Sequence, residues 1–163
     1  MEIRRATMED LDTILELFEQ AKAFMRKNGN MTQWTGNYPG RELIATDIQT
    51  GRSYIAEEGG GIGALFFFDR GEDVEPTYDE IDGAWLTGHS YGVMHRVVST
   101  GKYPGMVRFC SDWCLERCPS LRIDTHEDNK PMQDALKRCG FQYCGVVTIE
   151  DGTTRLAFEK VSV

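Results

Sequence analysis

The stretch "LRIDTHEDNKPMQDALKRCGF", from Leu121 to Phe141, does most to decide the fold. Its first five residues form a short strand-like run, and Asp128 or Asn129 can cap a helix that follows. Pro131 suits the first turn of that helix, and Gly140 suits the position just after its C-cap. Between them, apolar residues recur at helical spacing: Met132, Ala135, Leu136 and Cys139. The stretch therefore predicts a strand joined to an amphipathic helix.

Upstream, "HRVVSTGKYPGMV" (His95–Val107) joins another strand-like run, Tyr91–Ser99, to a helix expected from about Gly105 to Cys118. Glycines at a strand-to-helix turn allow backbone N–H groups to approach a phosphate closely. The path from this strand through the helix to the strand at Leu121–Thr125 is a crossover, which requires two parallel neighbouring strands. We therefore expect a cleft where the Tyr91–Ser99 strand ends.

The N-terminal part begins with an expected strand, Glu2–Ala6. Thr7 and Asp10 have the spacing of a capping box, which starts a helix that ends at "NGN". A second, shorter helix is expected over Arg41–Thr50. Turn signals then place the remaining strands in two hairpins: Ser53–Glu58 with Ile62–Asp69, and Phe141–Glu150 with Thr153–Val161.

The order of these elements is β-α-α-β-β-β-α-β-α-β-β. It predicts an α/β (α+β) fold in a single domain, residues 1–163, with a mixed, mostly antiparallel sheet of about seven strands and about four helices. One segment, Arg70–Ser90, remains as a long polar loop that carries several aromatic residues. Loops of that length in a small domain are usually functional or disordered, and the aromatic residues argue against disorder.

The composition narrows the classes of partner. The formal charge of −8 and the pI near 4.9 argue against nucleic acid or an anionic membrane, and they are compatible with a cationic substrate. The longest apolar run, Ile62–Phe68, is too short to cross a bilayer, and no signal peptide follows "MEIRR", so we expect a cytoplasmic protein. Cys110, Cys114 and Cys118 lack metal-site spacing. We expect reduced cysteines packed as small apolar residues, and no metal.

The two quoted stretches resemble motifs of the GNAT-type N-acetyltransferases, and the element order is similar over nearly the whole length. The first is similar to the family's strand and its helix with Asn and Gly-Phe. The second is similar to its pyrophosphate loop, Arg/Gln-x-x-Gly-x-Gly/Ala. The resemblance implies splayed parallel fourth and fifth strands and acetyl-CoA as co-substrate. The cofactor-binding residues that it implies are Val97, Val98, Ser99, Lys102, Tyr103, Gly105, Met106, Val107, Asn129 and Met132.

The chain departs from the family pattern at three positions. Val107 stands where the family has a small residue, and Lys102 supplies a cation without the forked donors of a guanidinium. Leu136 stands where many members have a tyrosine that protonates the departing thiolate. A CoA thiol needs little help to leave near neutral pH, so this loss is compatible with catalysis.

Direct acetyl transfer needs an oriented thioester and a deprotonated amine, but no enzyme nucleophile. We expect His95 to be the base, because an imidazole titrates near neutral pH. Glu80, in the long loop, is the other candidate for the base. Alternatively, His95 is a structural residue whose imidazole is hydrogen-bonded to the backbone. Tyr143 is the candidate replacement for the missing acid. We interpret Asp124, His126 and Glu127 as strand-end and capping residues.

The acceptor side is expected in the loop after the first helix and in the long segment. Aromatic residues in polar surroundings suggest a pocket wall: Trp34, Tyr38, Tyr78 and Trp85. The acidic residues near Tyr78, which include Glu75 and Glu80, could attract an ammonium group. Alternatively, the rings only pin the loops to the sheet.

The sequence therefore predicts an N-acetyltransferase that moves an acetyl group from acetyl-CoA to a primary amine of a small molecule or peptide, with a homodimer left open. The alternative is a non-catalytic acyl-CoA-binding or regulatory module, which Val107 and Leu136 favour. Transfer to a hydroxyl or use of a longer acyl group is also open.

Overall fold

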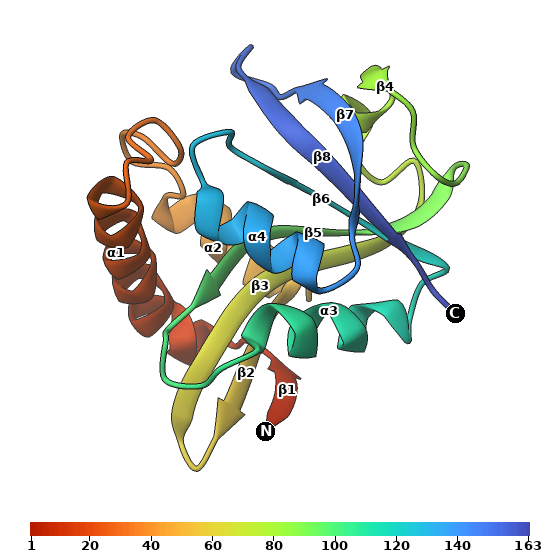
Figure 1. Cartoon of the computed structure of the whole chain (residues 1–163). Coiled ribbons are helices and arrows are strands. Elements are labelled where there is room, and N and C mark those ends of the chain that lie inside the picture. Colours follow the sequence, from red (N-terminus) through yellow and green to blue (C-terminus); the bar gives the residue numbers. More distant parts are fainter. The chain divides into compact units, whose positions relative to one another are not determined.

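A computed structural model describes all 163 residues (Figure 1). The chain forms two compact units. The N-terminal unit comprises Met1–Phe68 and Arg96–Met106, and the C-terminal unit comprises Asp69–His95 and Val107–Val163. Strands β3 (Gly61–Glu72) and β5 (Ser90–Ser99) each contribute residues to both units.

The N-terminal unit packs two helices on an antiparallel β1-β2-β3 arrangement. Its elements are β1 (Glu2–Arg5), α1 (Leu11–Lys27), α2 (Arg41–Gln49), β2 (Ser53–Glu58) and the first part of β3. Apolar residues of α1, α2, β2 and β3 form its core, among them Ile14, Phe18, Ile44, Ile55 and Leu65.

The predicted capping box is confirmed at the start of this unit. The Asp10 carboxylate accepts from the Thr7 backbone N–H at 2.7 Å and from the Thr7 hydroxyl at 3.3 Å. The capped segment is first a 3-10 turn, Met8–Asp10, and then α1.

The C-terminal unit holds β4 (Ile81–Gly83), most of β5, α3 (Met106–Leu115) from Val107 onward, β6 (Ser120–Thr125), α4 (Lys130–Arg138), β7 (Gln142–Thr148) and β8 (Thr154–Val161). The predicted parallel pair is β5 and β6, in register from Gly92 opposite Leu121 to Met94 opposite Ile123. β6 then pairs with β8, and β8 with β7, both antiparallel.

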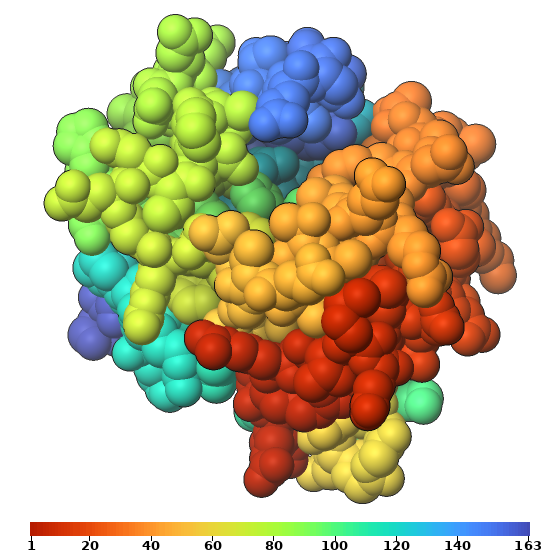
Figure 2. All heavy atoms as spheres, turned by 180° about the vertical axis from the view of Figure 1, so that it is seen from behind, coloured from red at the N-terminus to blue at the C-terminus, as the bar shows by residue number.

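The strand order is β1-β2-β3-β5-β6-β8-β7-β4, which confirms the mixed α+β sheet with four helices. The eighth strand, β4, lies in the segment expected to be a loop. Its sequence, Ile-Asp-Gly, has no alternation to reveal it, and it exists because it pairs with β7. Figure 2 shows the segment around residues 70–90, in yellow-green, as exposed surface.

The helix predicted after the strand Leu121–Thr125 forms as α4. The Asn129 side chain caps α4 by accepting from the Met132 backbone N–H at 3.2 Å, and Gly140 follows the helix with φ of +88°. Gln133 is buried although it is polar, because its amide donates to the carbonyls of His126 and Glu127.

All five cysteines are free thiols and buried, which confirms that they pack as small apolar residues. Burial raises the pKa of Cys110 to about 12 and that of Cys118 to about 11. The structure groups no three His, Cys, Asp or Glu side chains in a way that could hold a metal ion. None of its helices combines the length and the apolar character that crossing a membrane would need.

Candidate active site

A cluster of polar side chains gathers in the C-terminal unit around His95, the last β5 residue of that unit. The Nε2 atom of His95 lies 2.7 Å from Oε1 of Glu75, and its Nδ1 atom lies 3.8 Å from Oδ2 of Asp124. Because Met94 pairs with Ile123, the parallel register brings the next residues of β5 and β6, His95 and Asp124, side by side.

Glu75 comes to His95 from a short turn in the long segment. A 3-10 turn, Pro76–Tyr78, follows Glu75 directly, and the Tyr78 N–H donates to the Glu75 carbonyl at 3.0 Å. Proline at the first position of this turn fixes a backbone angle that the turn requires. The turn therefore delivers Glu75 and Tyr78 to the same cluster.

Tyr78 is a buried neutral donor in this cluster. Its hydroxyl donates to Oδ2 of Asp124 at 2.6 Å, and its ring meets that of His95 edge-on, with centroids 6.1 Å apart. Burial, followed by the nearby charge of Asp124, raises the pKa of Tyr78 well above its usual value. Tyr78 therefore keeps its proton and holds the Asp124 carboxylate in place.

Glu75 is a charged partner for the imidazole. Burial by itself raises the pKa of Glu75, but the hydrogen bond and charge of His95, with hydrogen bonds from Thr77, outweigh burial and leave the pKa below its usual value. A carboxylate on Nε2 assigns the tautomer with the proton on Nε2. In that tautomer Nδ1 is the nitrogen that can accept a proton, as in other carboxylate-oriented histidine bases.

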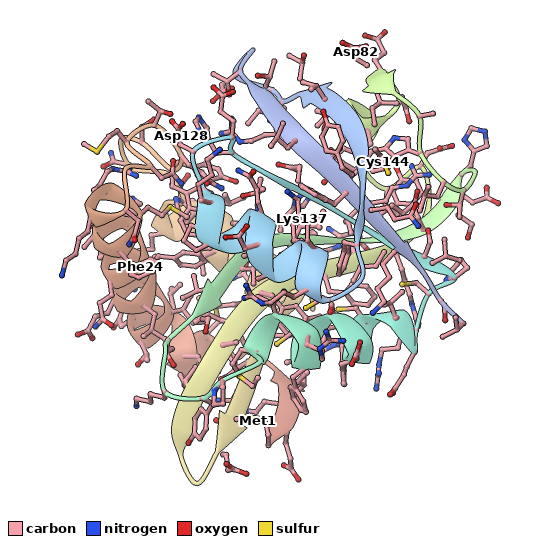
Figure 3. All side chains as sticks on the ribbon, in the orientation of Figure 1. Met1, Phe24, Asp82, Asp128, Lys137 and Cys144 are labelled. Carbon is pink, nitrogen blue, oxygen red and sulfur yellow. The ribbon has the colours of Figure 1, made fainter.

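The predicted residues of the long segment divide between this cluster and the surface. Trp85 joins the cluster, because its indole N–H donates to the Tyr78 carbonyl at 2.8 Å and the two rings lie 5.0 Å apart. Glu80 is exposed and lines an open depression beside β4 and β7. Asp82 lines the same depression, and Figure 3 shows it at the outer tip of β4, pointing away from the sheet.

Tyr143, the predicted acid, lies on β7 with its side chain mostly in solvent, 55% exposed. Its ring meets that of Phe158 on β8 edge-on, with centroids 5.7 Å apart. Leu136, at the position of the family's tyrosine, is fully buried. The structure therefore does not bring Tyr143 into the His95 cluster, and its role as an acid stays a prediction.

The two predicted aromatic residues of the N-terminal unit have different surroundings. Trp34 is buried and packs edge-on against Phe18, with centroids 5.3 Å apart. Tyr38 is half exposed, and its hydroxyl lies 3.2 Å from Nη1 of Arg96, which also pairs with Asp47 at 2.7 Å. Their roles in substrate binding stay predictions.

The predicted cofactor loop follows β5 in the N-terminal unit. Thr100 ties its start to β3, since the Thr100 N–H donates to the Gly63 carbonyl at 3.0 Å. Lys102 is exposed and pairs with no carboxylate, and Gly105 has φ of +72° with open space where a Cβ would be. The other cofactor predictions in this unit are Val97, partly buried, Val98 and Met106, both buried, Ser99, exposed, and Tyr103, partly buried.

Three further cofactor predictions belong to the C-terminal unit. Val107 lies in the first turn of α3, and Asn129 and Met132 form the capped start of α4. Sequence reasoning missed the contacts of His95 with Asp124, interpreted as a strand-end residue, and with Glu75, interpreted only as a source of negative charge. No local pattern could link Glu75 to a histidine 20 residues away.

No family model matches the chain, and no curated protein sequence matches it significantly. Among solved structures, a GNAT-family acetyltransferase from Streptococcus agalactiae 2603 is 34% identical, with 99% of this chain and 95% of that chain covered and a TM-score of 0.89. A structure described as a putative acetyltransferase from Staphylococcus aureus Mu50 is 26% identical over 100% of both chains, with a TM-score of 0.72.

A third structure, an aminoglycoside acetyltransferase in complex with coenzyme A and kanamycin, has a TM-score of 0.64. It is 16% identical, with 98% of this chain and 93% of that chain covered, and so shows only the shared fold. The first of these likenesses is close enough to decide the family. The chain belongs to the GNAT family of acetyltransferases.

Proposed function

We propose that this protein transfers an acetyl group from acetyl-CoA directly to a primary amine of a small molecule or peptide. Family membership supports acyl transfer in general. The observation that carries the amine-directed part is the His95–Glu75 pair, with a distance of 2.7 Å between Nε2 and Oε1. A base is what direct transfer needs from the enzyme, because an ammonium group must lose a proton before its nitrogen can attack a thioester.

Each member of the cluster has a role in this proposal. Glu75 holds the proton on Nε2, so that Nδ1 of His95 accepts the proton from the acceptor amine. Asp124, at 3.8 Å from Nδ1, places a negative charge where the ammonium group would approach, and the Tyr78 hydroxyl keeps that carboxylate oriented. Glu80 is the weaker candidate for the base, because it is exposed and nothing orients its carboxylate.

The residues of the loop after β5 fit a cofactor that carries phosphate groups. Lys102 offers an exposed cation, and nothing lies within 4 Å of the Cβ positions of Gly101 and Gly105, which suits a phosphate that approaches the backbone closely. Bound acetyl-CoA would supply the activated thioester. Lys102 and the loop backbone would hold its diphosphate, and by resemblance the backbone of Val97–Ser99 would receive the pantetheine part.

The experiment is a thiol-release assay with acetyl-CoA and a panel of amines, run as a pH profile. In the wild-type protein, kcat/KM should rise with pH as the base loses its proton. We expect His95→Gln to lower kcat/KM by about 10²–10⁴-fold, the usual contribution of a general base, and to remove this rising limb of the pH profile. Glu80→Gln is the matched control, because it makes the same type of change in an exposed carboxylate, and it should stay within about twofold. A limb that persists in His95→Gln and disappears in Glu80→Gln would move the base to Glu80.

One observation favours a second candidate, a non-catalytic acyl-CoA-binding module. Leu136 is fully buried at the position of the family's acid, and the exposed Tyr143 is not in the His95 cluster. Calorimetry with acetyl-CoA separates the two functions. Binding of acetyl-CoA without turnover on any amine of the panel would favour the module.

A further inference from the structure

A buried ion pair lies under the long segment of the C-terminal unit. Glu159 on β8 is fully buried, and its carboxylate is 3.1 Å from Nε of Arg122 on β6. The same carboxylate accepts from the Leu86 backbone N–H at 2.7 Å, from the Ser120 hydroxyl at 2.7 Å and from the Thr87 hydroxyl. The pair therefore ties the end of the long segment to the sheet.

The guanidinium group of Arg122 also binds the long segment. Its Nη2 donates to the carbonyls of Thr87 at 2.9 Å and Gly88 at 2.7 Å. Its guanidinium also lies over two rings, 4.3 Å from the centroid of Trp85 and 3.9 Å from that of Tyr91. Only a planar, forked cation can make these bonds and stack on two rings at once.

Those two rings hold the two ends of the turn that carries the proposed catalytic pair. Trp85 donates from its indole N–H to the Tyr78 carbonyl at 2.8 Å. The Tyr91 hydroxyl lies 3.3 Å from the Glu75 N–H, which donates to it, and 3.4 Å from the Glu75 carbonyl. Arg122 is thus connected, through one aromatic side chain on each side, to both Glu75 and Tyr78.

A buried ion pair is weak support for stability, because desolvation of both charges offsets their attraction. The geometry points to a different role, and we propose that Arg122 is a positioning residue for the acetyl-transfer site. Its guanidinium sets the two rings, and the rings set the turn at which Glu75 meets His95 and Tyr78 meets Asp124. For its effect on turnover this inference rests on the proposed function, but the placement of the imidazole can be measured without turnover.

The first test is Arg122→Lys, which keeps a positive charge beside Glu159 but loses the fork and the flat stacking surface. We expect kcat to fall by about 10–100-fold, the effect of misplacing a catalytic group by about 1 Å, with the KM for acetyl-CoA unchanged. Long-range 1H–15N spectra provide the second readout, because the chain has only three histidines. The wild-type protein should show His95 protonated on Nε2, and the variant should show a mixture of tautomers.

Arg155→Lys is the matched control. Arg155 is also a buried arginine of this unit, on β8, and its hydrogen bonds are local, to the Thr153 hydroxyl at 3.0 Å and the Thr154 carbonyl at 2.9 Å. The same substitution there should leave both kcat and the His95 spectrum unchanged. An equal effect of both substitutions would mean general destabilisation and would overturn the proposal.

If Arg122→Lys does not fold, Trp85→Phe carries the test. It keeps a ring against the guanidinium and removes the N–H that donates to the Tyr78 carbonyl, so both readouts should change in the same direction. A folded Arg122→Lys or Trp85→Phe with the wild-type kcat and His95 spectrum would refute positioning. If the wild-type protein turns over no amine but the spectrum changes as expected, the positioning role stands and the proposed function fails.

Discussion

The pairing of β4 with β7 predicts the outcome of Gly145→Ala. β7 carries a bulge between Tyr143 and Gly145, and Gly145 lies opposite Gly83 of β4 in the antiparallel pair. A Cβ at Gly145 would lie 2.2 Å from the carbonyl oxygen of Asp82, and a Cβ at Gly83 would lie 2.2 Å from that of Cys144. Gly145 also has φ of +144°, which side chains with a Cβ rarely adopt.

The magnitude follows from what must move. The obstructing atom is backbone, so β4 must shift by at least 0.8 Å to restore 3.0 Å from 2.2 Å. That shift loosens the pairing of Ile81–Gly83 with β7 and the bond from the Ala84 N–H to the Cys144 carbonyl. Backbone strain of about 1–3 kcal/mol and two lost hydrogen bonds of about 0.5–1.5 kcal/mol each give a destabilisation of about 2–6 kcal/mol.

Urea unfolding, followed by circular dichroism, measures this destabilisation. Gly152→Ala is the control, because Gly152 also has a positive φ, +84°, but nothing lies within 4 Å of its Cβ position. It should cost only about 1–2 kcal/mol. If Gly145→Ala is no more destabilising than Gly152→Ala, the close approach of β4 to β7 is not real and the reasoning is refuted.

Three further predictions concern the cofactor loop, Glu75 and the buried thiols. Lys102→Ala should weaken CoA binding about tenfold at low salt and less at high salt, measured by calorimetry, whereas the exposed Lys27→Ala should not change it. His95→Gln should raise the pKa of Glu75 in 13C NMR titrations. Because the folded-state pKa of Glu75 is lowered, the wild-type pair stabilises the fold above about pH 4.3 and loses this contribution as pH falls through the folded-state pKa. The variant should therefore lose less stability than the wild type on acidification. Cys110 and Cys118, with pKa values raised to about 12 and about 11, should resist a thiol reagent at about pH 8 until the protein unfolds, and mass mapping of labelled peptides checks this.

Local patterns identified most of the elements correctly. The cap at Asn129, the apolar stripe of α4 and the glycine after it depend on residues within a few positions of one another, so they can be recognised in the sequence. The crossover from β5 to β6 also follows from chain order, because a helix between two strands of one sheet makes them parallel. The same reasoning missed β4, since three residues without alternation form a strand only when a partner is present.

The candidate site likewise has a part that the sequence predicts and a part that only the structure shows. The sequence by itself determined that His95 lies within a strand that has a parallel neighbour, and that the long segment before this strand carries aromatic and acidic residues. Only the tertiary structure decided that Glu75 rather than Glu80 reaches the imidazole, and that Trp34 packs into a core. The physical reason is that the Glu75–His95 contact depends on strand register and on the turn at Pro76, and the Trp34–Phe18 contact on how a loop folds back onto α1. Neither contact leaves a periodic signal in the chain.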